Sequence, residues 1–338
     1  MIRPAPEFEN VDRDMFETRI VPTGRPAVLR NLVGDWPMVS MGRSSIQDLS
    51  DHLREHANDE PTIIWSGAPE IEGRFSYSGD LKGYNHTQEN IPLSVLLDRM
   101  AAHHDDPDPP AFYAGGVALR RHLPGLLAET PMPLLRKPEG ERRVSLWLGN
   151  RLRTAAHWDL PQNLACVVAG RRRFTLFPTD QIGNLYIGPV DFTLSGQPIS
   201  LVDFRKPDFD RHPRFAEALE HAEVAELQPG DALYMPSLWF HHVESLDPFG
   251  AMVNFWWRDA PAHMGAPIFS LLHGLLTLRD LPHNERQAWR AIFDHYLFRP
   301  DDVDPMAHIP QDAQGLFAPM TPDIQRRLRA TLAAPLTR

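Results

Sequence analysis

The sequence of 338 residues lacks the features that mark several common classes of protein. It has a single cysteine, Cys166, which excludes an intrachain disulfide and a CxxC metal site. It has no apolar run of about 18 residues, so we expect no membrane-spanning helix and no membrane partner. Residues 1–4 lead into polar sequence without the apolar stretch of a signal peptide. These features together predict a cytoplasmic protein.

The chain also lacks a basic tract. Its 34 lysines and arginines are outnumbered by 44 aspartates and glutamates, which gives a formal net charge of −10 with neutral histidines. A nucleic-acid groove needs clustered positive charge to bind phosphates, so we expect no nucleic-acid partner. Internal repeats and low-complexity segments are likewise missing from the sequence.

Proline, by contrast, is abundant, with 33 residues at roughly twice the usual share. Proline ends helices and strands, which predicts many short elements joined by rigid loops. From about residue 140 to residue 257, short apolar runs alternate with turns rich in Gly, Pro and Asp. Runs at 143–148, 164–168 and 173–177 are examples. This pattern is typical of a β-sandwich or β-barrel.

The segments on either side of the β-rich region have different residue patterns. Before it, short strand patterns alternate with amphipathic helix patterns, which predicts an α/β segment. After residue 262, apolar residues recur at helical spacing on both sides of Pro282 and predict a helix pair. We therefore expect an N-terminal segment (1–140) that buttresses a β-core (141–262), followed by a helical segment (263–338). The helix pair either packs on the core or forms a homodimer through residues 266–297.

Two short motifs bring potential metal ligands to the β-rich region. In His157-Trp158-Asp159 the imidazole and the carboxylate are two residues apart, so both point the same way on an extended segment. Alone this motif is a weak signal, because a histidine and an aspartate at a strand end are usually structural. In the second motif a Pro-Gly-Asp turn and a strand precede His241-His242. Adjacent strand residues face opposite sides, so only one of these histidines can face into a barrel.

A third motif places Asn254 and Trp256 on one face of a strand. A buried amide needs a hydrogen-bond partner, and a pocket would supply one. Two histidines and one carboxylate on one face of an iron leave three coordination positions open, as in non-haem Fe(II) oxygenases. The three motifs together favour such a metal site over a purely structural role.

The sequence around these motifs resembles the JmjC/cupin-like (cupin_8) Fe(II)- and 2-oxoglutarate-dependent oxygenases. Within that family it is most similar to the asparaginyl hydroxylase of the hypoxia-inducible factor. The resemblance spans roughly residues 25–260 and is most specific at 154–159, 174–178, 202–209 and 229–245. It implies a mainly β fold, with a double-stranded β-helix (jelly roll) of about eight strands as catalytic core.

The resemblance also implies roles for individual residues. It assigns the iron to His157, Asp159 and His241, because the family uses the histidine directly after the aromatic pair. A family lysine that binds 2-oxoglutarate falls at Arg172, although Arg171 and Arg173 flank it and leave the register open. The remaining positions that it places around the cosubstrate are Tyr113, Thr154, Asn163, Asn254 and Trp256.

The implied activity is hydroxylation of an unactivated C–H bond with Fe(II), 2-oxoglutarate and O2. By analogy the leading substrate is a protein or peptide side chain, followed by a small molecule; methyl-lysine demethylation is less favoured. The chain departs from the asparaginyl hydroxylase at Pro198 and Ile199, where that enzyme grips the substrate amide with an Arg-Gln pair. This departure puts an asparagine substrate in doubt. In a different class, the chain would be a cupin-type protein that binds a metal or ligand without redox chemistry.

Overall fold

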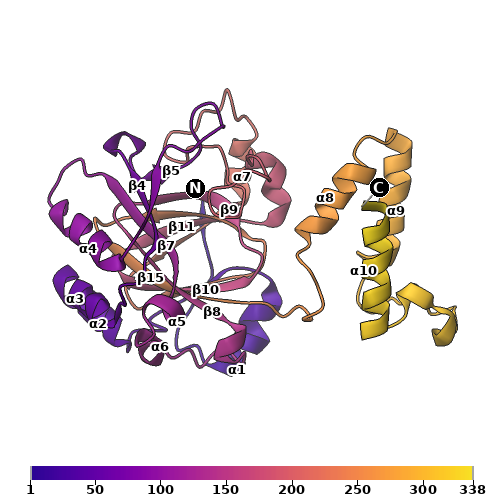
Figure 1. The fold of residues 1–338 in the computed structure, drawn as a ribbon, viewed down its shortest axis with the longest axis horizontal. Coiled ribbons are helices and arrows are strands. Elements are labelled where there is room, and N and C mark those ends of the chain that lie inside the picture. The colour runs from indigo at the N-terminus through magenta and orange to yellow at the C-terminus, as the bar shows by residue number, and fades with distance from the viewer. Residues whose placement is uncertain (1, 337–338) are drawn as a thin grey trace. The chain divides into compact units, whose positions relative to one another are not determined.

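The computed structural model describes residues 2–336, which fall into two compact units, 1–258 and 259–338. The first unit holds two β-sheets that face each other (Figure 1). The six-stranded sheet has the order β1 (Arg3–Pro4), β12 (Glu223–Leu227), β11 (Arg172–Phe177), β14 (Phe240–Ser245), β9 (Arg153–Trp158) and β5 (Arg74–Phe75). The nine-stranded sheet has the order β2 (Glu7–Phe8), β3 (Ala27–Leu29), β13 (Ala232–Met235), β10 (Gln162–Ala169), β15 (Gly250–Trp257), β8 (Arg143–Gly149), β7 (Ala111–Ala118), β4 (Thr62–Gly67) and β6 (Thr87–Ile91).

The eight strands β8 to β15 lie between residues 143 and 257 and form the jelly-roll core, which confirms the expected fold class. The strands of the N-terminal segment join both sheets. β5 extends the six-stranded sheet beside β9, and β7 extends the nine-stranded sheet beside β8. Taken alone, each core sheet would have edge strands whose backbone N–H and C=O groups lack partners. The N-terminal strands pair with these edge strands and provide the partners.

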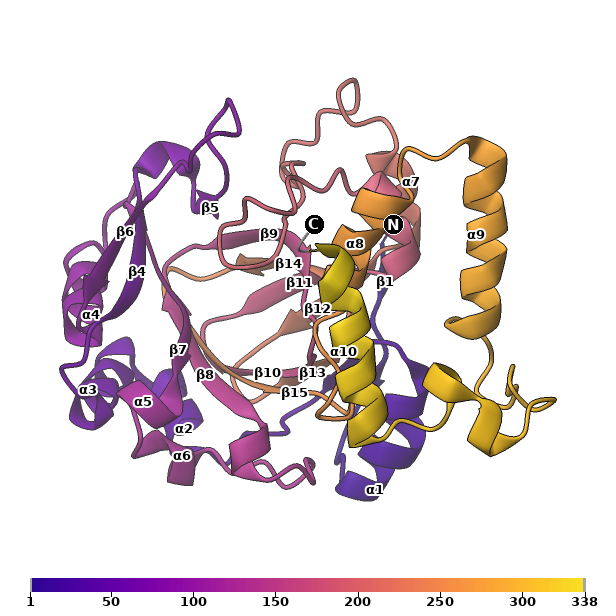
Figure 2. The same cartoon turned by 45° about the vertical axis from the view of Figure 1, so that its right-hand side comes forward.

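The central strand β10 shows how the sequence positions the core. Leu164 and Cys166 pack with the helices on the outer face of the nine-stranded sheet. Ala165 and Val167 point the other way, into the space between the two sheets. Because both faces of β10 are covered, its sequence is a continuous apolar run rather than an alternating one. Figure 2 shows the two layers, with β9 and β14 in one and β10 and β13 in the other.

Helices cover the outer face of the nine-stranded sheet. Helix α3 (Ile46–His56) begins after Ser45, whose hydroxyl accepts a hydrogen bond from the Asp48 N–H as the N-cap. Leu49 and Leu53 of this helix are fully buried against the sheet. The helices of the first unit are α1 (Arg13–Met15), α2 (Pro37–Ser44), α3 (Ile46–His56), α4 (Leu93–Ala102), α5 (Leu119–His122), α6 (Leu126–Glu129) and α7 (Phe215–His221).

The second unit contains the helices α8 (Ile268–Thr277), α9 (His283–Tyr296) and α10 (Pro322–Leu336). The first two are the helix pair expected around Pro282. Within α8 and α9, all of whose residues are described, no side chain is buried. Phe269 is 68% exposed and Leu276 is 73% exposed. Over residues 2–336, no helix is both long and apolar enough to cross a membrane.

This exposed apolar face makes the predicted homodimer through residues 266–297 testable. We expect the wild-type chain to have twice its 38.4 kDa mass in solution, because a face of this kind is usually covered by a partner. Replacing Leu272 and Trp289 together by Asp should give the monomer mass in light scattering. Gln287→Asp, on the opposite side of α9, should leave the dimer intact. A monomeric wild-type chain would contradict the prediction.

Candidate metal and cosubstrate site

The structure brings His157, Asp159 and His241 together at one end of the space between the sheets. His157 on β9 lies directly opposite His241 on β14 in the strand register, and their ring centroids are 4.3 Å apart. Asp159 follows β9, and its Oδ2 lies 3.7 Å from His241 Nε2. One potential ligand atom from each residue falls within 4.8 Å of the other two. Two imidazoles and one carboxylate can therefore share a metal ion here.

Both imidazoles are oriented by hydrogen bonds on their far side. His157 Nδ1 lies 2.9 Å from the Ala155 carbonyl oxygen, and His241 Nδ1 lies 3.2 Å from the Trp239 carbonyl oxygen. A carbonyl can only accept, so Nδ1 carries the proton and Nε2 keeps a free lone pair toward the metal position. Burial lowers the pKa of His241 to about 4, so this ring is neutral near pH 7. A neutral imidazole is the form that binds a metal.

The carboxylate of this group is positioned by the turn that precedes β14. Between the two ligands, Trp158 points away from the site and packs edge-on against Phe240 at 5.3 Å. The Leu238 N–H donates to the Asp159 carbonyl oxygen at 2.9 Å. Leu238 adopts a left-handed backbone conformation (φ 68°), which is rare for a leucine and is often found at functional sites.

An irregularity in β9 decides which of its side chains face the site. His157 pairs with His241, but Thr154 rather than Ala155 pairs with Val243, so β9 has one extra residue at this point. Without that residue, Thr154 and His157 would lie on opposite faces of the strand. With it, both line the same cavity. The carbonyl of Ala156 within the bulge accepts a hydrogen bond from the Ser200 N–H at 2.7 Å.

The adjacent histidine, His242, faces the other side of the strand. Its ring stacks on Phe204 with centroids 4.3 Å apart. Neither ring nitrogen has a hydrogen-bond partner among the described residues. Burial lowers the pKa of His242 to about 3, so it is a neutral ring in an apolar setting. The geometry thus separates the two neighbouring histidines, and only His241 joins the metal group.

Arg172 is the one arginine of its triplet that is buried, and its side chain is inside the jelly roll. Arg171 bonds Asp247 and Arg173 bonds Glu226, both at the surface. The Nε and Nη2 atoms of Arg172 have no hydrogen-bond partner among the described residues. Burial lowers the pKa of Arg172 to about 10, which still leaves it charged near pH 7. A buried cation of this kind requires an anionic partner.

Two hydroxyl groups accompany this guanidinium. The charge of Arg172 and the neighbouring Thr154 hydroxyl both act on the buried Tyr113 hydroxyl and favour its ionised form. Burial is the main cause of the raised pKa of Tyr113, so its phenol keeps its proton. The guanidinium and these hydroxyls can all donate hydrogen bonds. Together they form a set of donors that fits a carboxylate.

The predicted amide residues are buried but lie behind the cavity wall. Asn254 Nδ2 donates to Asn163 Oδ1 at 3.4 Å, and the Trp147 indole N–H donates to Asn254 Oδ1 at 2.6 Å. The partner expected for Asn254 is thus provided by the protein. Trp256 does line the cavity, where Arg143 lies over its ring at 5.1 Å.

A cavity of about 720 Å³ opens beside His157 and Asp159. Its wall is largely aromatic, and the sequence motifs did not reveal most of it. Trp147 could have been recognised, because strand alternation places it opposite Leu146 and Leu148, which are fully buried on the outer face. The apolar lining residues are Trp65, Phe75, Tyr113, Trp147, Leu194, Ile199, Trp256 and Trp257.

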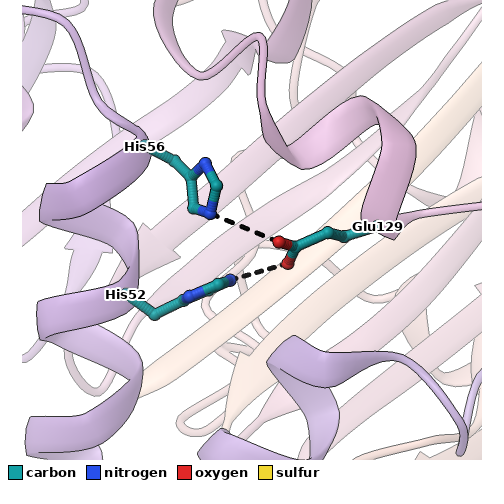
Figure 3. A group of neighbouring side chains, drawn as sticks. All are labelled: His52, His56 and Glu129. Carbon is teal, nitrogen blue, oxygen red and sulfur yellow. Dashed lines mark hydrogen bonds and ion pairs between the residues drawn. The ribbon is translucent and has the colours of Figure 1, made fainter.

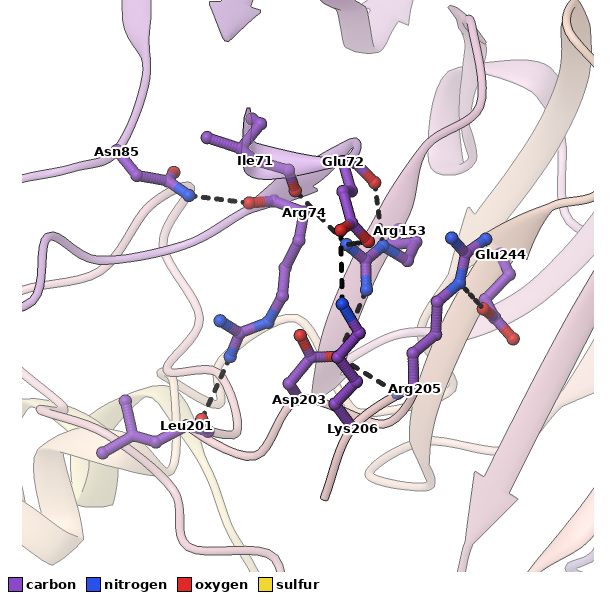
Figure 4. A network of polar contacts seen from close by, with 10 residues as sticks. All are labelled: Ile71, Glu72, Arg74, Asn85, Arg153, Leu201, Asp203, Arg205, Lys206 and Glu244. Carbon is purple, nitrogen blue, oxygen red and sulfur yellow. Dashed lines mark hydrogen bonds and ion pairs between the residues drawn. The ribbon is translucent and has the colours of Figure 1, made fainter. Parts of the chain in front are cut away.

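A buried arginine fixes the loops around this cavity (Figure 4). Arg153, 3% exposed on β9, donates to the Glu72 carbonyl oxygen at 2.9 Å and to Asp203 at 3.2 Å. From the neighbouring strand β5, Arg74 donates to the Leu201 carbonyl oxygen at 3.0 Å. The segments around residues 72 and 203 are thereby held against the strand that carries His157.

A second pair of contacts closes the outer ends of the same loops. The Tyr77 hydroxyl donates to the Phe192 carbonyl oxygen, and the Tyr84 hydroxyl donates to the Thr193 carbonyl oxygen, each at 2.7 Å. The Tyr84 and Phe192 rings stack with centroids 5.0 Å apart. These contacts join the segment 77–84 to residues 192–193, directly before Leu194 and Ser195, which line the cavity.

Comparison with known proteins gives this site a family context. The cupin-like domain family matches residues 13–263. A lysine-specific demethylase of Arabidopsis thaliana is 25% identical over 291 residues, which is 74% of this chain but only 50% of that protein. The tRNA wybutosine-synthesizing protein 5 of Gallus gallus is 26% identical over 272 residues, 76% of this chain and 78% of that protein. The JmjC domain-containing protein F of Dictyostelium discoideum is 31% identical over 166 residues, 43% and 35% of the two chains.

The chain thus spans about half the length of the Arabidopsis relative and most of the Gallus one. These matches support the predicted JmjC/cupin-like resemblance at the level of the family. The closer likeness to the asparaginyl hydroxylase stays a prediction.

The different surroundings of the two neighbouring histidines lead to a testable difference. His241→Ala should weaken Fe(II) binding by more than roughly 100-fold, because it removes a ligand rather than a supporting contact. His242→Leu should keep Fe(II) binding and should not lower the unfolding temperature, because the ring it replaces makes no polar contact in the described chain. Anaerobic Fe(II) titration and thermal unfolding measure the two outcomes. Loss of iron binding in His242→Leu would reverse the assignment.

Proposed function

Since the chain belongs to the cupin-like domain family, we propose that it is an Fe(II)- and 2-oxoglutarate-dependent oxygenase. The observation that carries this proposal is Arg172, a buried guanidinium whose Nε and Nη2 atoms have no hydrogen-bond partner among the described residues, in the same jelly roll as a His-Asp-His group. A protein that only binds a metal has no use for a buried cation next to it. A dicarboxylate cosubstrate needs both an open metal and a distal cation.

The fit of the residues to this cosubstrate follows from their chemistry. His157, Asp159 and His241 would hold Fe(II) through two neutral imidazoles and a carboxylate, leaving coordination positions open. Arg172, Tyr113 and Thr154 would hold the distal carboxylate of 2-oxoglutarate. When bound, Fe(II) with 2-oxoglutarate and O2 supplies the oxidation of a C–H bond to an alcohol, with succinate and CO2 as the other products. Asn254 accepts a hydrogen bond from Trp147 and donates one to Asn163, so the two amides support the wall.

The protein's own contribution to the reaction is positioning and exclusion of water. Trp65, Phe75 and Trp147 give the cavity a largely apolar wall, which limits the water that reaches the oxidising centre. Arg153 anchors the surrounding loops to β9, so the substrate would meet walls that are already in place. Because these walls are ordered before the substrate binds, less conformational entropy is lost on binding.

For the substrate, we propose a protein or peptide side chain that enters the cavity beside the segment 194–199, four of whose residues line it. The Arabidopsis relative is named as a lysine-specific demethylase, which supports a side-chain substrate for the same type of pocket. A free small molecule is the second candidate, because a cavity of about 720 Å³ with an aromatic wall lies in the usual range of small-molecule sites. Stimulation of 2-oxoglutarate turnover by a peptide library, and not by a metabolite library, would separate them.

The oxygenase proposal has a direct spectroscopic test. Anaerobic addition of Fe(II) and 2-oxoglutarate should produce a weak visible charge-transfer band, and admission of O2 should produce succinate. His157→Ala should abolish both signals, because the iron loses a ligand. A chain that binds Fe(II) but gives neither band nor succinate would instead be a non-redox cupin-type binding protein.

The role proposed for Arg172 can be tested against its own neighbour. Arg172→Met should raise the KM for 2-oxoglutarate roughly 100-fold, because it removes a charge-assisted bidentate contact of about 3 kcal/mol. The KM of Arg172→Lys should lie between those of the wild type and Arg172→Met, since an ammonium keeps the charge but not the two parallel N–H donors. Arg173→Met is the matched control and should leave KM unchanged, because Arg173 bonds Glu226 at the surface. Succinate formation against 2-oxoglutarate concentration gives the values; equal effects of both Met variants would refute the role.

A further inference from the structure

We propose that His52, His56 and Glu129 form a second metal site, for a divalent transition-metal ion of the zinc class. Figure 3 shows both imidazoles directed at the two oxygens of one carboxylate. His52 Nε2 lies 2.7 Å from Glu129 Oε2, and His56 Nε2 lies 3.3 Å from Glu129 Oε1. Within residues 2–336, this group and the His157 group are the two sets of three such side chains whose donor atoms lie within 4.8 Å.

The local structure explains why these donors converge. His52 and His56 are four residues apart on α3, so they lie one turn apart on the same face, with ring centroids 4.6 Å apart. Glu129 is the last residue of α6. The helix that carries the histidines is fixed by the Ser45 cap and by the buried Leu53. The donors therefore sit on elements that hold their geometry before a metal arrives.

A glycine makes the approach of the second histidine possible. A Cβ atom at Gly125, just before α6, would lie 2.3 Å from His56 Nδ1. Any side chain there would push the ring out of its present position. Gly125 thus allows α6 to approach α3 closely enough for Glu129 to reach both imidazoles.

The spacing of the donors is close to what coordination demands. Zinc binds imidazole nitrogen and carboxylate oxygen at about 2.1 Å, so neighbouring ligand atoms of a tetrahedral site are about 3.4 Å apart. The contacts of 2.7 Å from His52 and 3.3 Å from His56 end on different oxygens of Glu129, so they are not both distances to one ligand atom. A rotation of the glutamate side chain by a few tenths of an ångström would bring one oxygen to this spacing from both imidazoles.

The donor set also points to a metal with an open position. Two histidines and one glutamate are the protein ligands of several zinc sites, with water as the fourth ligand. His52 is 10% exposed at its side chain, whereas those of His56 and Glu129 are 26% and 25% exposed. One side of the group is thus buried and the other is open to water. Borderline metals such as zinc prefer imidazole donors, whereas magnesium and calcium prefer oxygen.

This group lies across the nine-stranded sheet from the His157 group. Leu49 and Leu53 of α3 pack with the apolar side chains on the outer face of that sheet, as does Leu126 of α6. The cavity beside His157 is on its inner face, where Trp147 points. A metal here would clamp α6 onto α3 without taking part in the proposed oxidation. The inference therefore does not depend on the proposed function.

The test uses the full chain with the first site removed by His157→Ala and His241→Ala. Anaerobic titration with Co²⁺ should then show one bound ion per chain, with the intense visible bands of a low-coordinate site. Zn²⁺ should displace it. At a free Zn²⁺ concentration 100 times Kd, the unfolding equilibrium constant should fall about 100-fold, which appears as a higher unfolding temperature.

Glu129→Gln in that background is the decisive variant, because an amide keeps hydrogen bonds to the imidazoles but is a poor metal ligand. It should lose the cobalt bands and the zinc-dependent thermal shift while remaining folded. Gly125→Ala should weaken Zn²⁺ binding at least tenfold without removing a ligand. His104→Ala, at an exposed histidine, should bind like the parent.

The alternative is an ion pair that joins two helices without a metal. It predicts that the parent binds no Co²⁺ and shows no thermal shift with Zn²⁺, while Glu129→Gln has the same stability with and without the ion. That result, or a Glu129→Gln variant that binds Co²⁺ as tightly as its parent, overturns the proposal.

Discussion

The single extra residue in β9 is the constraint on which the arrangement of the candidate site depends. It puts Thr154 and His157 on one face of a strand whose ordinary alternation would separate them. It also leaves the Ala155 carbonyl free to orient the His157 ring. Because Arg153 lies at the start of the same strand, the anchoring of the cavity loops and the orientation of the imidazole are properties of one short segment.

Burial affects the charge of two polar side chains inside the jelly roll in different ways. His241 loses its charge when water is removed, and a neutral ring is what a metal requires. Arg172 keeps its charge at the cost of a lowered pKa, and it needs an anion. A metal cation at one end and a carboxylate at the other satisfy both.

The sequence was informative where function depends on short spacings and poor where it depends on register. His157 and Asp159 are two residues apart, and one of His241 and His242 must face inward, so a His-Asp-His group could be proposed from the residues. The choice of His241 came from the family resemblance. The bulge in β9 has no turn or glycine signal, because it is stabilised by Ser200 from a distant loop. The register of Arg172 was equally hidden within a run of three arginines.

The second histidine pair shows the same limit. The spacing of His52 and His56 is visible in the sequence, but their carboxylate lies 77 positions beyond His52. No local pattern connects them. Likewise, short strand patterns are visible in the N-terminal segment, while the distribution of its strands over both sheets depends on which edges of the core were left open.

The uncompensated charge of Arg172 has a consequence for the stability of the protein in a cell. A folded chain that carries a buried cation without its counter-ion is less stable than the same chain with it. If the dicarboxylate is that counter-ion, then its supply sets how often the chain opens to proteases as well as how fast it turns over. The fraction of folded chain would then rise with the concentration of that ligand.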